Sequence, residues 1–365
     1  MWNQWTRFFN KCFYRALASM LPPRAEPLPR DPRLILVLST TGIGDSLFDS
    51  AAIKSLKLGY PNATIVVAAH HRRQSVAEHN PFVDIVLPLS KSPFSQRRLL
   101  KYFKNRQPDL VVALHVNEEA VPLGYLLNRR AFVGSLERCQ DFSFLLSHPV
   151  RTEEEEHIVE ATLKVAQAAQ GANIDRGMVY QVREEEIKRL HEDYPQLRKP
   201  FLVFQTGGGR TLSWRNWPVE SYIQLINWLN EHTDYQIILT GGQDNREAGG
   251  SIAKACPWVL NLVEKTTLEQ TGALLKEAVM LLSTDTGVMH LGFAIGCPTL
   301  ALLHYRSPAR MYGPLDNRPG HQIIELQKPD WESSREAASS KNEMSHISVE
   351  SVIREMKSML KITGP

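Results

Sequence analysis

The 365-residue sequence lacks the features that mark several common classes of protein. It has only four cysteines, which lie far apart and form no CxxC pair, so neither a disulfide framework nor a zinc site is indicated. No apolar run is long enough to cross a membrane as a helix. The N-terminal segment has no uninterrupted apolar core before a small-residue cleavage site, so we do not expect a secretory signal. These absences predict a protein of the reducing cytoplasm.

Several catalytic motifs are also missing. HExxH, Walker A and GxSxG do not occur, and there is no Asp-x-Asp pair to bridge a metal ion to a diphosphate. Neither sign of charge dominates, because 42 lysines and arginines stand against 39 acidic residues. Residues 1–150 are mildly basic, with 19 lysines and arginines against 11 acidic residues, which predicts an anionic partner for this half. The excess is too small, and too poor in interleaved aromatics, to indicate nucleic acid.

What the sequence does contain is a repeated alternation of short apolar segments with helical ones. This pattern predicts an α/β fold in which parallel sheets carry helices on both faces. The predicted strands are residues 34–38, 64–69, 85–87, 110–114 and 131–133, then 201–205, 236–240, 259–262, 278–282 and 299–303. The predicted helices are 47–58, 71–79, 95–105 and 153–170, then 219–230, 246–255, 268–276, 288–295 and 347–360. In the helix over 153–170, we expect Glu153–Glu156 to occupy the first turn, where acidic residues favour the helix dipole.

The restart of this pattern after Pro200 predicts two doubly wound, Rossmann-like domains that face each other across a cleft. The expected parts are an N-terminal arm with a proline-rich spacer (1–31), a first Rossmann-like domain (32–182), a linker (183–200), a second Rossmann-like domain (201–328), and a loop with a closing helix (329–365).

One strand-to-helix turn has the composition of a phosphate site. The apolar strand over 278–282 runs through Ser283, Thr284, Asp285, Thr286 and Gly287 into an apolar helix. Such a turn presents backbone N–H groups and the positive end of a helix dipole, which suit a phosphate. It is equally typical of an ordinary helix start with Asp285 or Thr286 as the N-cap.

Glycine-bearing turns follow two other strands of the second half. Gly207, Gly208 and Gly209 follow the first strand, and Gly241 and Gly242 follow the next. Successive glycines expose backbone donors, which suits a pyrophosphate. Arg215 lies just before the following helix and could neutralise a leaving phosphate, or it could be a solvated loop residue.

The first half has its own strand-tip turn, Gly42-Ile43-Gly44-Asp45. It lacks a third glycine, and no acidic residue ends the second strand, so a nicotinamide-binding fingerprint is not indicated. Asp45 at such a tip could act as a general base, or it could only cap the following helix. Basic residues nearby, including Arg72, Arg73, Arg98 and Lys101, could contact an acidic acceptor or lie on solvated faces.

The N-terminal arm has aromatic and aliphatic residues at helical spacing, among them Trp2, Trp5, Phe9 and Phe13, with basic residues between them. A basic helix of this kind suits a membrane surface. Docking of residues 1–22 on the body of the protein explains the pattern equally well.

The motifs together resemble glycosyltransferase family 9, the lipopolysaccharide core heptosyltransferases of GT-B fold, over roughly residues 33–328. The resemblance is carried by Gly44-Asp45, Arg215-Asn216-Trp217-Pro218, Thr240-Gly241-Gly242, Lys265-Thr266-Thr267-Leu268 and Asp285-Thr286-Gly287-Val288-Met289-His290.

The resemblance implies an inverting, metal-independent enzyme without a cofactor, acting on the inner face of the cytoplasmic membrane. It would move a heptose from ADP-L-glycero-D-manno-heptose to a lipid-anchored, anionic oligosaccharide acceptor, with Asp45 in the position of the catalytic base. The expected donor-binding residues are Gly207, Gly208, Thr211, Arg215, Gly241, Gly242, Gln243, Thr266, Asp285, Thr286, Gly287 and His290. The expected acceptor-binding residues are Gly42, Gly44, Arg72, Arg73, Arg98 and Lys101.

Two other functions fit the same residues. One is a GT-B transferase or epimerase that uses another nucleotide sugar, and the other is a non-catalytic nucleotide-sugar-binding or membrane scaffold protein.

Overall fold

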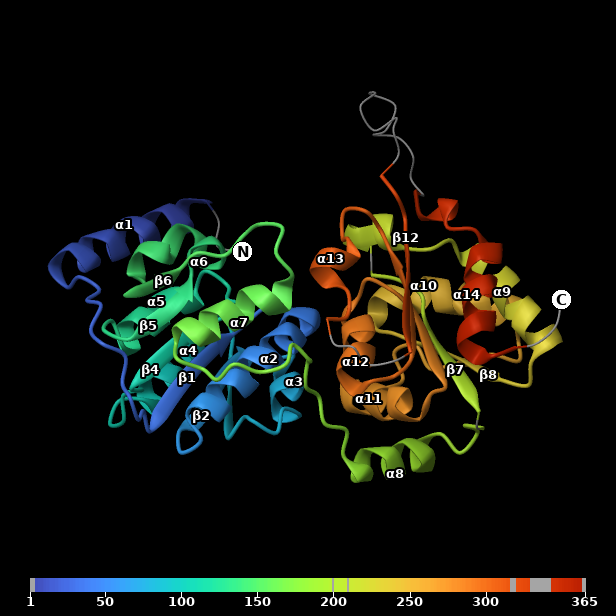
Figure 1. Cartoon of the computed structure of the whole chain (residues 1–365), viewed down its shortest axis with the longest axis horizontal. Helices are drawn as coiled ribbons and strands as arrows, with labels where there is room; N and C mark the ends of the chain where they lie inside the picture. The colour runs from blue at the N-terminus through green and yellow to red at the C-terminus, as the bar shows by residue number, and fades with distance from the viewer. Residues whose placement is uncertain (1–3, 199, 209, 316–319, 329–342, 363–365) are drawn as a thin grey trace. The chain divides into compact units, whose positions relative to one another are not determined.

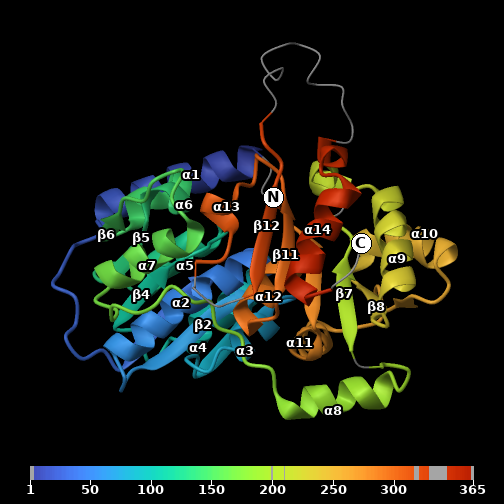
Figure 2. The same ribbon diagram turned by 45° about the vertical axis from the view of Figure 1, so that its right-hand side comes forward.

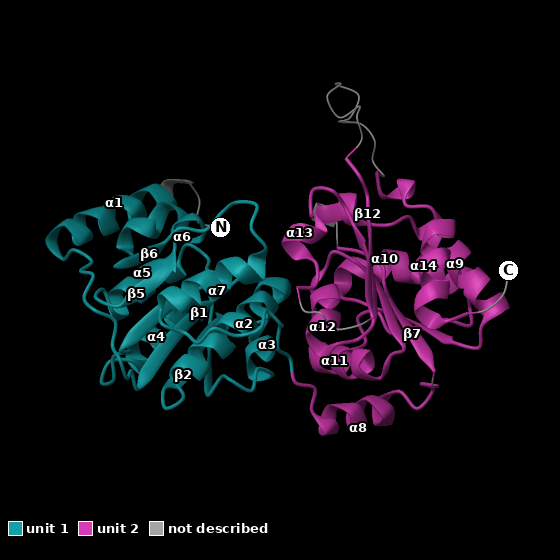
Figure 3. Cartoon of the chain, in the orientation of Figure 1, with its two compact units in different colours: residues 1–180 teal, residues 181–365 magenta. Residues whose placement is uncertain are grey.

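The computed structural model describes residues 4–198, 200–208, 210–315, 320–328 and 343–362. The chain forms two compact units, residues 1–180 and 181–365 (Figure 3). Each unit is built on one parallel six-stranded sheet with helices on both faces. The predicted pair of doubly wound domains is therefore confirmed. Among the described residues, no helix is both long enough and apolar enough to cross a membrane.

The sheet of the first unit has the strand order β3-β2-β1-β4-β5-β6 (Figure 1). Its strands are β1 (Leu34–Ser39), β2 (Thr64–His70), β3 (Ile85–Leu89), β4 (Leu110–Ala113), β5 (Phe132–Ser135) and β6 (His148–Val150). Central strands of such sheets are covered on both faces, and β1 accordingly consists of buried residues throughout. The chain changes direction across the sheet between β1 and β4, so the turns after these two strands lie side by side.

Two helical layers cover this sheet. One face packs against α2 (Ile43–Gly59), α3 (Gln74–Glu78) and α7 (Ile158–Ala168). The other packs against α4 (Pro93–Tyr102), α5 (Ala120–Leu127), α6 (Leu136–Cys139) and the 3₁₀ turn η1 (Gln140–Leu145).

The arm forms α1 (Gln4–Met20), which docks on the second of these layers. Its basic residues make the contacts: Arg7 and Lys11 reach Asp141 at 3.0 and 2.6 Å, and Arg7 also reaches Glu118 at 2.6 Å. Tyr14 packs edge-on against Phe142. Leu17 and Ala18 of α1 also pack against the core of this unit. Docking on the body, one of the two alternatives, is therefore realised, through ion pairs and apolar contacts together.

The sheet of the second unit has the order β12-β11-β10-β7-β8-β9. Its strands are β7 (Phe201–Gln205), β8 (Gln236–Thr240), β9 (Leu260–Asn261), β10 (Met280–Thr284), β11 (Thr299–Leu303) and β12 (His321–Glu325). Figure 2 shows one face covered by α9 (Val219–His232), α10 (Arg246–Ala255) and α14 (Val349–Leu360), and the other by α11 (Leu268–Glu277) and α12 (Gly287–Ile295). Shorter elements among its described residues are η2 (Arg210–Arg215), η3 (Gln243–Asn245), α13 (Ala309–Tyr312) and η6 (Glu343–His346).

Some local predictions were wrong. The helix expected from residue 153 begins at Ile158, because His157 supplies the N-cap and its Nδ1 accepts from the Val159 N–H. Glu153–Glu156 therefore precede the helix, and Glu156 forms an ion pair with Lys164 at 2.5 Å instead of facing the helix dipole. The expected linker, 183–200, contains α8 (Glu184–Asp193), which contacts α11 through His191 and Glu277 at 2.6 Å. Most of the loop expected at 329–345 lies outside the described residues.

Candidate active site

The turns after β1 and β4 are tied together at the carboxyl edge of the first sheet. The Thr40 N–H donates to the His115 carbonyl at 2.7 Å, and the Asn117 N–H donates to the Thr40 Oγ1 at 2.8 Å. This is the edge at which open α/β sheets bind ligands. The turn of Gly42, Gly44 and Asp45 starts from it.

Asp45 lies in the first turn of α2, three residues after the N-cap Gly42. Its Oδ2 accepts a hydrogen bond from the Gly42 N–H at 2.8 Å, so the capping alternative is realised. The other oxygen, Oδ1, lies 3.9 Å from the His115 Nε2, and the Asp45 side chain is 40% exposed. One carboxylate thus caps its own helix and keeps a surface that a ligand can reach.

The environment of Asp45 favours the ionised form. Burial raises the pKa of its carboxyl, but the neighbouring His115, hydrogen bonds from Gly42 and Thr41, and the Arg138 guanidinium together outweigh burial. The net pKa lies below the ordinary carboxyl value. A carboxylate held in this state at neutral pH can accept a proton.

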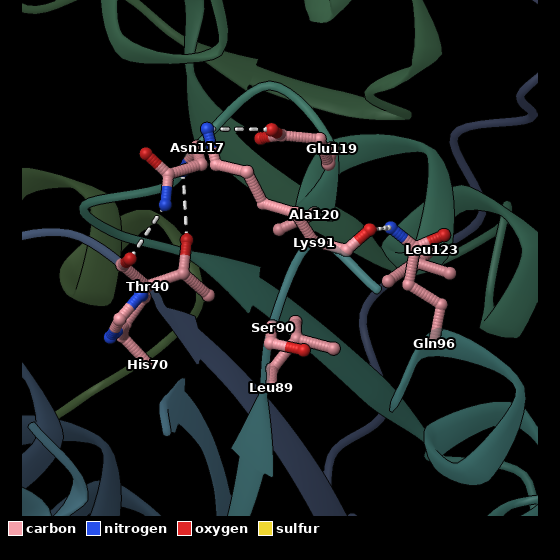
Figure 4. Close-up of a pocket in the computed structure, with 10 residues that line it drawn as sticks. All are labelled: Thr40, His70, Leu89, Ser90, Lys91, Gln96, Asn117, Glu119, Ala120 and Leu123. Atoms are coloured by element: carbon pink, nitrogen blue, oxygen red, sulfur yellow. Dashed lines mark hydrogen bonds and ion pairs between the residues drawn. The ribbon is translucent and has the colours of Figure 1, made fainter. Parts of the chain in front are cut away.

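A small hollow lies beside the β1 tip (Figure 4). Its lining includes Thr40, His70, Lys91, Asn117 and Glu119, and the Lys91 Nζ lies 3.0 Å from the Glu119 carboxylate. Burial, and then the positive charges of Arg73, His71, Arg72 and Lys91, lower the pKa of His70. Because Lys91 is paired with Glu119, the hollow itself has no excess of positive charge.

The expected acceptor residues divide into two groups. Arg73 reaches the β1 turn, where its guanidinium donates to the Thr41 carbonyl at 2.6 Å, and the exposed Arg72 precedes it. Arg98 and Lys101 are exposed on α4. Among the described residues, no hydrogen bond or ion pair joins either of these two side chains to the Asp45 turn.

In the second unit, the turn after β10 is built around a buried carboxylate. Asp285 is 4% exposed and meets Arg215 at 2.9 Å, His290 at 3.4 Å and the Ser307 hydroxyl at 2.5 Å. Burial raises the pKa of Asp285, but His290, Arg215 and Ser307 lower this pKa by more than burial raises it. The net pKa lies below the ordinary carboxyl value, so the group is ionised. Arg215, Asp285 and His290, which are distant in sequence, thus form one cluster.

The adjoining helix start remains suited to an anion. Thr286 is the N-cap of α12, but its side chain makes no capping hydrogen bond to the N–H groups of the first turn, where Gly287 stands. Asp285 does not serve as the cap because its oxygens are used by Arg215, His290 and Ser307. Thr286 therefore occupies the N-cap position, as one alternative expected, but its side chain leaves the first-turn N–H groups without a cap.

The glycine turns after β7 and β8 require glycine. Gly207 has φ +132°, and an added Cβ there would meet the Asn216 Oδ1 at 2.3 Å. Gly241 has φ +144°, and an added Cβ would meet the Asn245 Oδ1 at the same separation. L-residues rarely adopt such φ values. Asn245 also donates to the Gly207 carbonyl at 2.7 Å, which fixes the two turns to each other.

The remaining donor residues follow the same edge. Gly208 lies against the Thr286 methyl, whereas Gly242 and Gln243 are exposed at the β8 tip. The Glu264 N–H donates to the Gly241 carbonyl at 2.8 Å, which brings the loop containing Thr266 beside that tip. The Thr211 side chain lies outside what the structure describes.

Sequence analysis missed Asp49, His115, Arg138, Lys91 and Ser307. Two of them carried a signal, because Asp49 follows Asp45 by one helical turn and His115 stands directly beyond an apolar strand. The others come together only through tertiary packing.

Comparison with known proteins identifies the family. The family model of glycosyltransferase family 9 (heptosyltransferase) matches residues 97–339. The chain belongs to glycosyltransferase family 9. It is similar to the lipopolysaccharide core heptosyltransferase OpsX of Haemophilus influenzae, with 22% identity over 90% of this chain and 97% of the relative. It is also similar to lipopolysaccharide heptosyltransferase 2 of Salmonella typhimurium, with 24% identity over 75% and 83% of the two chains.

Solved structures share the GT-B fold of this family 9 enzyme. The structure of the Escherichia coli ADP-heptose lipopolysaccharide heptosyltransferase II matches with a TM-score of 0.74 at 21% identity. The match covers 90% of this chain and 98% of the Escherichia coli chain. A more distant one, at TM-score 0.54 and 12% identity, is the iron-containing heptosyltransferase TibC. Among the described residues, no group of three or more His, Cys, Asp or Glu side chains is placed to hold a metal ion.

Proposed function

We propose that this family 9 glycosyltransferase moves a heptose from ADP-L-glycero-D-manno-heptose to the inner core of lipopolysaccharide, with inversion at the sugar C1. The observation that carries the proposal is the cluster of Arg215, Asp285 and His290 beside two glycine turns on one sheet edge. The names of the relatives supply the donor, since one of the solved structures is an ADP-heptose lipopolysaccharide heptosyltransferase.

In this proposal the second unit holds the donor. The start of α12 faces the diphosphate, and Arg215 neutralises the negative charge that develops on the leaving phosphate. The Gly207 and Gly208 N–H groups donate to Gln205 and Asn216, so these glycines shape the turn beside the diphosphate. Asp285 orients Arg215 through the 2.9 Å contact. Because arginine and backbone donors stabilise the leaving group, no step requires a metal ion.

The first unit would hold the acceptor and the base. The Asp45 carboxylate takes the proton of an acceptor hydroxyl, whose oxygen attacks C1 opposite the diphosphate. The bond from C1 to the phosphate oxygen breaks, and its electron pair leaves with ADP. Arg73, whose guanidinium lies at the β1 turn, and the exposed Arg72 would meet the anionic groups of the acceptor.

The identity of the donor can be tested with a panel of nucleotide sugars. Release of the nucleotide is measured in a buffer that contains EDTA, with and without an inner-core oligosaccharide as acceptor. We expect release from ADP-heptose, dependent on the acceptor, and little from ADP-glucose, UDP-glucose or UDP-N-acetylglucosamine. Turnover of a UDP-sugar alone would favour the alternative transferase or epimerase. ADP binding without transfer to any acceptor would favour a non-catalytic binding protein.

The exposed face of α1 supports peripheral attachment to a membrane. Phe8, Phe9, Phe13 and Met20 are between 58% and 73% exposed, on a helix whose Arg7 and Lys11 are used in ion pairs with the body. Attachment would therefore be mainly hydrophobic, with a weak dependence on salt. The lipid-anchored acceptor would lie at the same surface.

The double substitution Phe9→Ser with Phe13→Ser is expected to weaken binding to vesicles of phosphatidylethanolamine and phosphatidylglycerol by about 100-fold, because burial of each ring in the interface contributes roughly 1.5 kcal/mol or more. Cosedimentation measures the change. Trp258→Ser is the control, since Trp258 is 48% exposed on the second unit. Equal binding by the double variant and the wild type would refute the membrane role of α1.

A further inference from the structure

A fully buried carboxylate lies one helical turn beyond Asp45. Asp49 on α2 is 0% exposed, and three donors reach it. The Ser39 hydroxyl donates to its Oδ2 at 2.6 Å, the His115 backbone N–H approaches the same oxygen at 3.3 Å, and the His115 Nδ1 lies 2.6 Å from its Oδ1. Burial of an ionised carboxylate is costly unless its lone pairs are matched in this way.

The contacts assign the tautomer of His115. A carboxylate only accepts hydrogen bonds, so the His115 Nδ1 carries a proton and donates it to Asp49. A guanidinium only donates, and Arg138 Nη1 contacts the His115 Nε2, so this second nitrogen carries a lone pair. A chain of hydrogen bonds therefore runs from the Arg138 guanidinium through the imidazole to the Asp49 carboxylate.

We propose that Asp49 and His115 are positioning residues for Asp45: the buried carboxylate fixes the imidazole tautomer, and the imidazole holds the Arg138 guanidinium beside the base. This inference deepens the proposed function and rests on it for the role of Asp45. Because Asp49 is fully buried, it acts through His115 and not on a substrate directly.

The chain acts on Asp45 through charge and orientation. The charged or titratable groups that face Asp45 are His115 at the β4 tip and Arg138 on α6. Those that face His115 are Asp45 and Asp49 on α2 and Arg138. Glu137, the acidic neighbour of Arg138, is turned to Ser135 and Thr152. With the imidazole in place, the guanidinium is held where it favours ionised Asp45.

Asp49→Asn reverses the tautomer without changing the shape of the side chain. The His115 backbone N–H can only donate, so the oxygen of the new amide must occupy the position of the Asp49 Oδ2. The amide NH₂ then faces Nδ1, which must accept, so the proton moves to Nε2 and opposes Arg138. In a serine protease, a carboxylate-to-amide change that gives the wrong tautomer lowers kcat by several powers of ten. Here the change acts on the base through a second residue, so we expect a smaller loss in kcat, of about 10- to 100-fold.

Two measurements test the proposal on the full-length enzyme. The acid limb of the pH profile of kcat should move up by about one pH unit in Asp49→Asn, because Asp45 loses a positive neighbour, whereas the KM for ADP-heptose should stay unchanged. The ¹⁵N spectrum of the imidazoles, assigned with His115→Gln, should show the proton of His115 moving from Nδ1 to Nε2. Ser39→Ala is the matched control, because it removes the donor to the other Asp49 oxygen and should change neither result.

An unmoved acid limb, or an unchanged His115 tautomer, in Asp49→Asn would overturn the proposal. If that variant does not fold, Arg138→Gln on the half-buried α6 serves instead, and it must move the acid limb of the kcat profile to higher pH. Full turnover by Asp45→Asn would overturn the base assignment of the proposed function, while the ¹⁵N spectrum would still decide whether Asp49 sets the tautomer. The two failures are therefore distinguishable.

Discussion

Asp45→Asn is expected to lower the rate of heptose transfer by about 10²- to 10⁴-fold, the usual contribution of a general base. An amide cannot accept the proton of the acceptor hydroxyl. It can still take the hydrogen bond from the Gly42 N–H that caps α2, so the fold should be retained. The affinity for ADP-heptose should stay the same, because the donor residues lie in the other unit. Single-turnover transfer and calorimetric titration with the donor separate these two effects.

Asp175→Asn is the matched control for this change. Asp175 is a 67% exposed carboxylate of the same unit, paired with Lys54, and its loss should leave transfer unchanged. The low pKa of Asp45 adds a second signature. The wild-type rate should be flat at neutral pH and should fall only in acid, as protons neutralise the carboxylate. Transfer by Asp45→Asn at the wild-type rate would contradict the assignment.

The strand tips could be predicted from the sequence because their chemistry is local. A buried parallel strand shows itself as an apolar run, and the turn after it shows itself through glycine and small polar residues. Gly207 and Gly241 were predicted on this basis, and their positive φ values give the physical reason. Asp45 and Asp285 were found in the same way, since each directly follows such a tip.

The partners of these residues could not be predicted, because long-range packing selects them. Arg215 was expected to be either a phosphate ligand or a solvated residue, and no local pattern indicates its 2.9 Å contact with Asp285. The pairing of His115 with Asp49 depends on β4 lying beside β1. The orientation of α1 is a similar case: helical spacing shows the amphipathic face, but Asp141 and Glu118 on the body decide which face docks.

The contact between Arg215 and Asp285 gives the second large prediction. Arg215→Gln should lower kcat by about 10²- to 10³-fold, as loss of a preorganised donor to developing charge does in other enzymes. It should also destabilise the second unit by roughly 3 kcal/mol, because the 4% exposed Asp285 loses its guanidinium partner. Arg215→Lys keeps the positive charge and should retain most of the turnover, although a lysine ammonium lacks the paired N–H donors of a guanidinium.

The stability loss should depend on pH in a defined direction. The folded-state pKa of Asp285 is depressed, so its contribution to stability is present above the ordinary carboxyl pKa and is lost as the pH falls through the folded value. Without Arg215 the folded pKa rises, and acid unfolding should begin at a higher pH than in the wild type. Thermal unfolding across the acid range measures this shift. Arg246→Gln, which removes an exposed partner of Glu264, is the control and should leave both kcat and the acid transition unchanged. If Arg215→Gln kept the wild-type kcat but unfolded early in acid, Arg215 would serve the fold and not the leaving group.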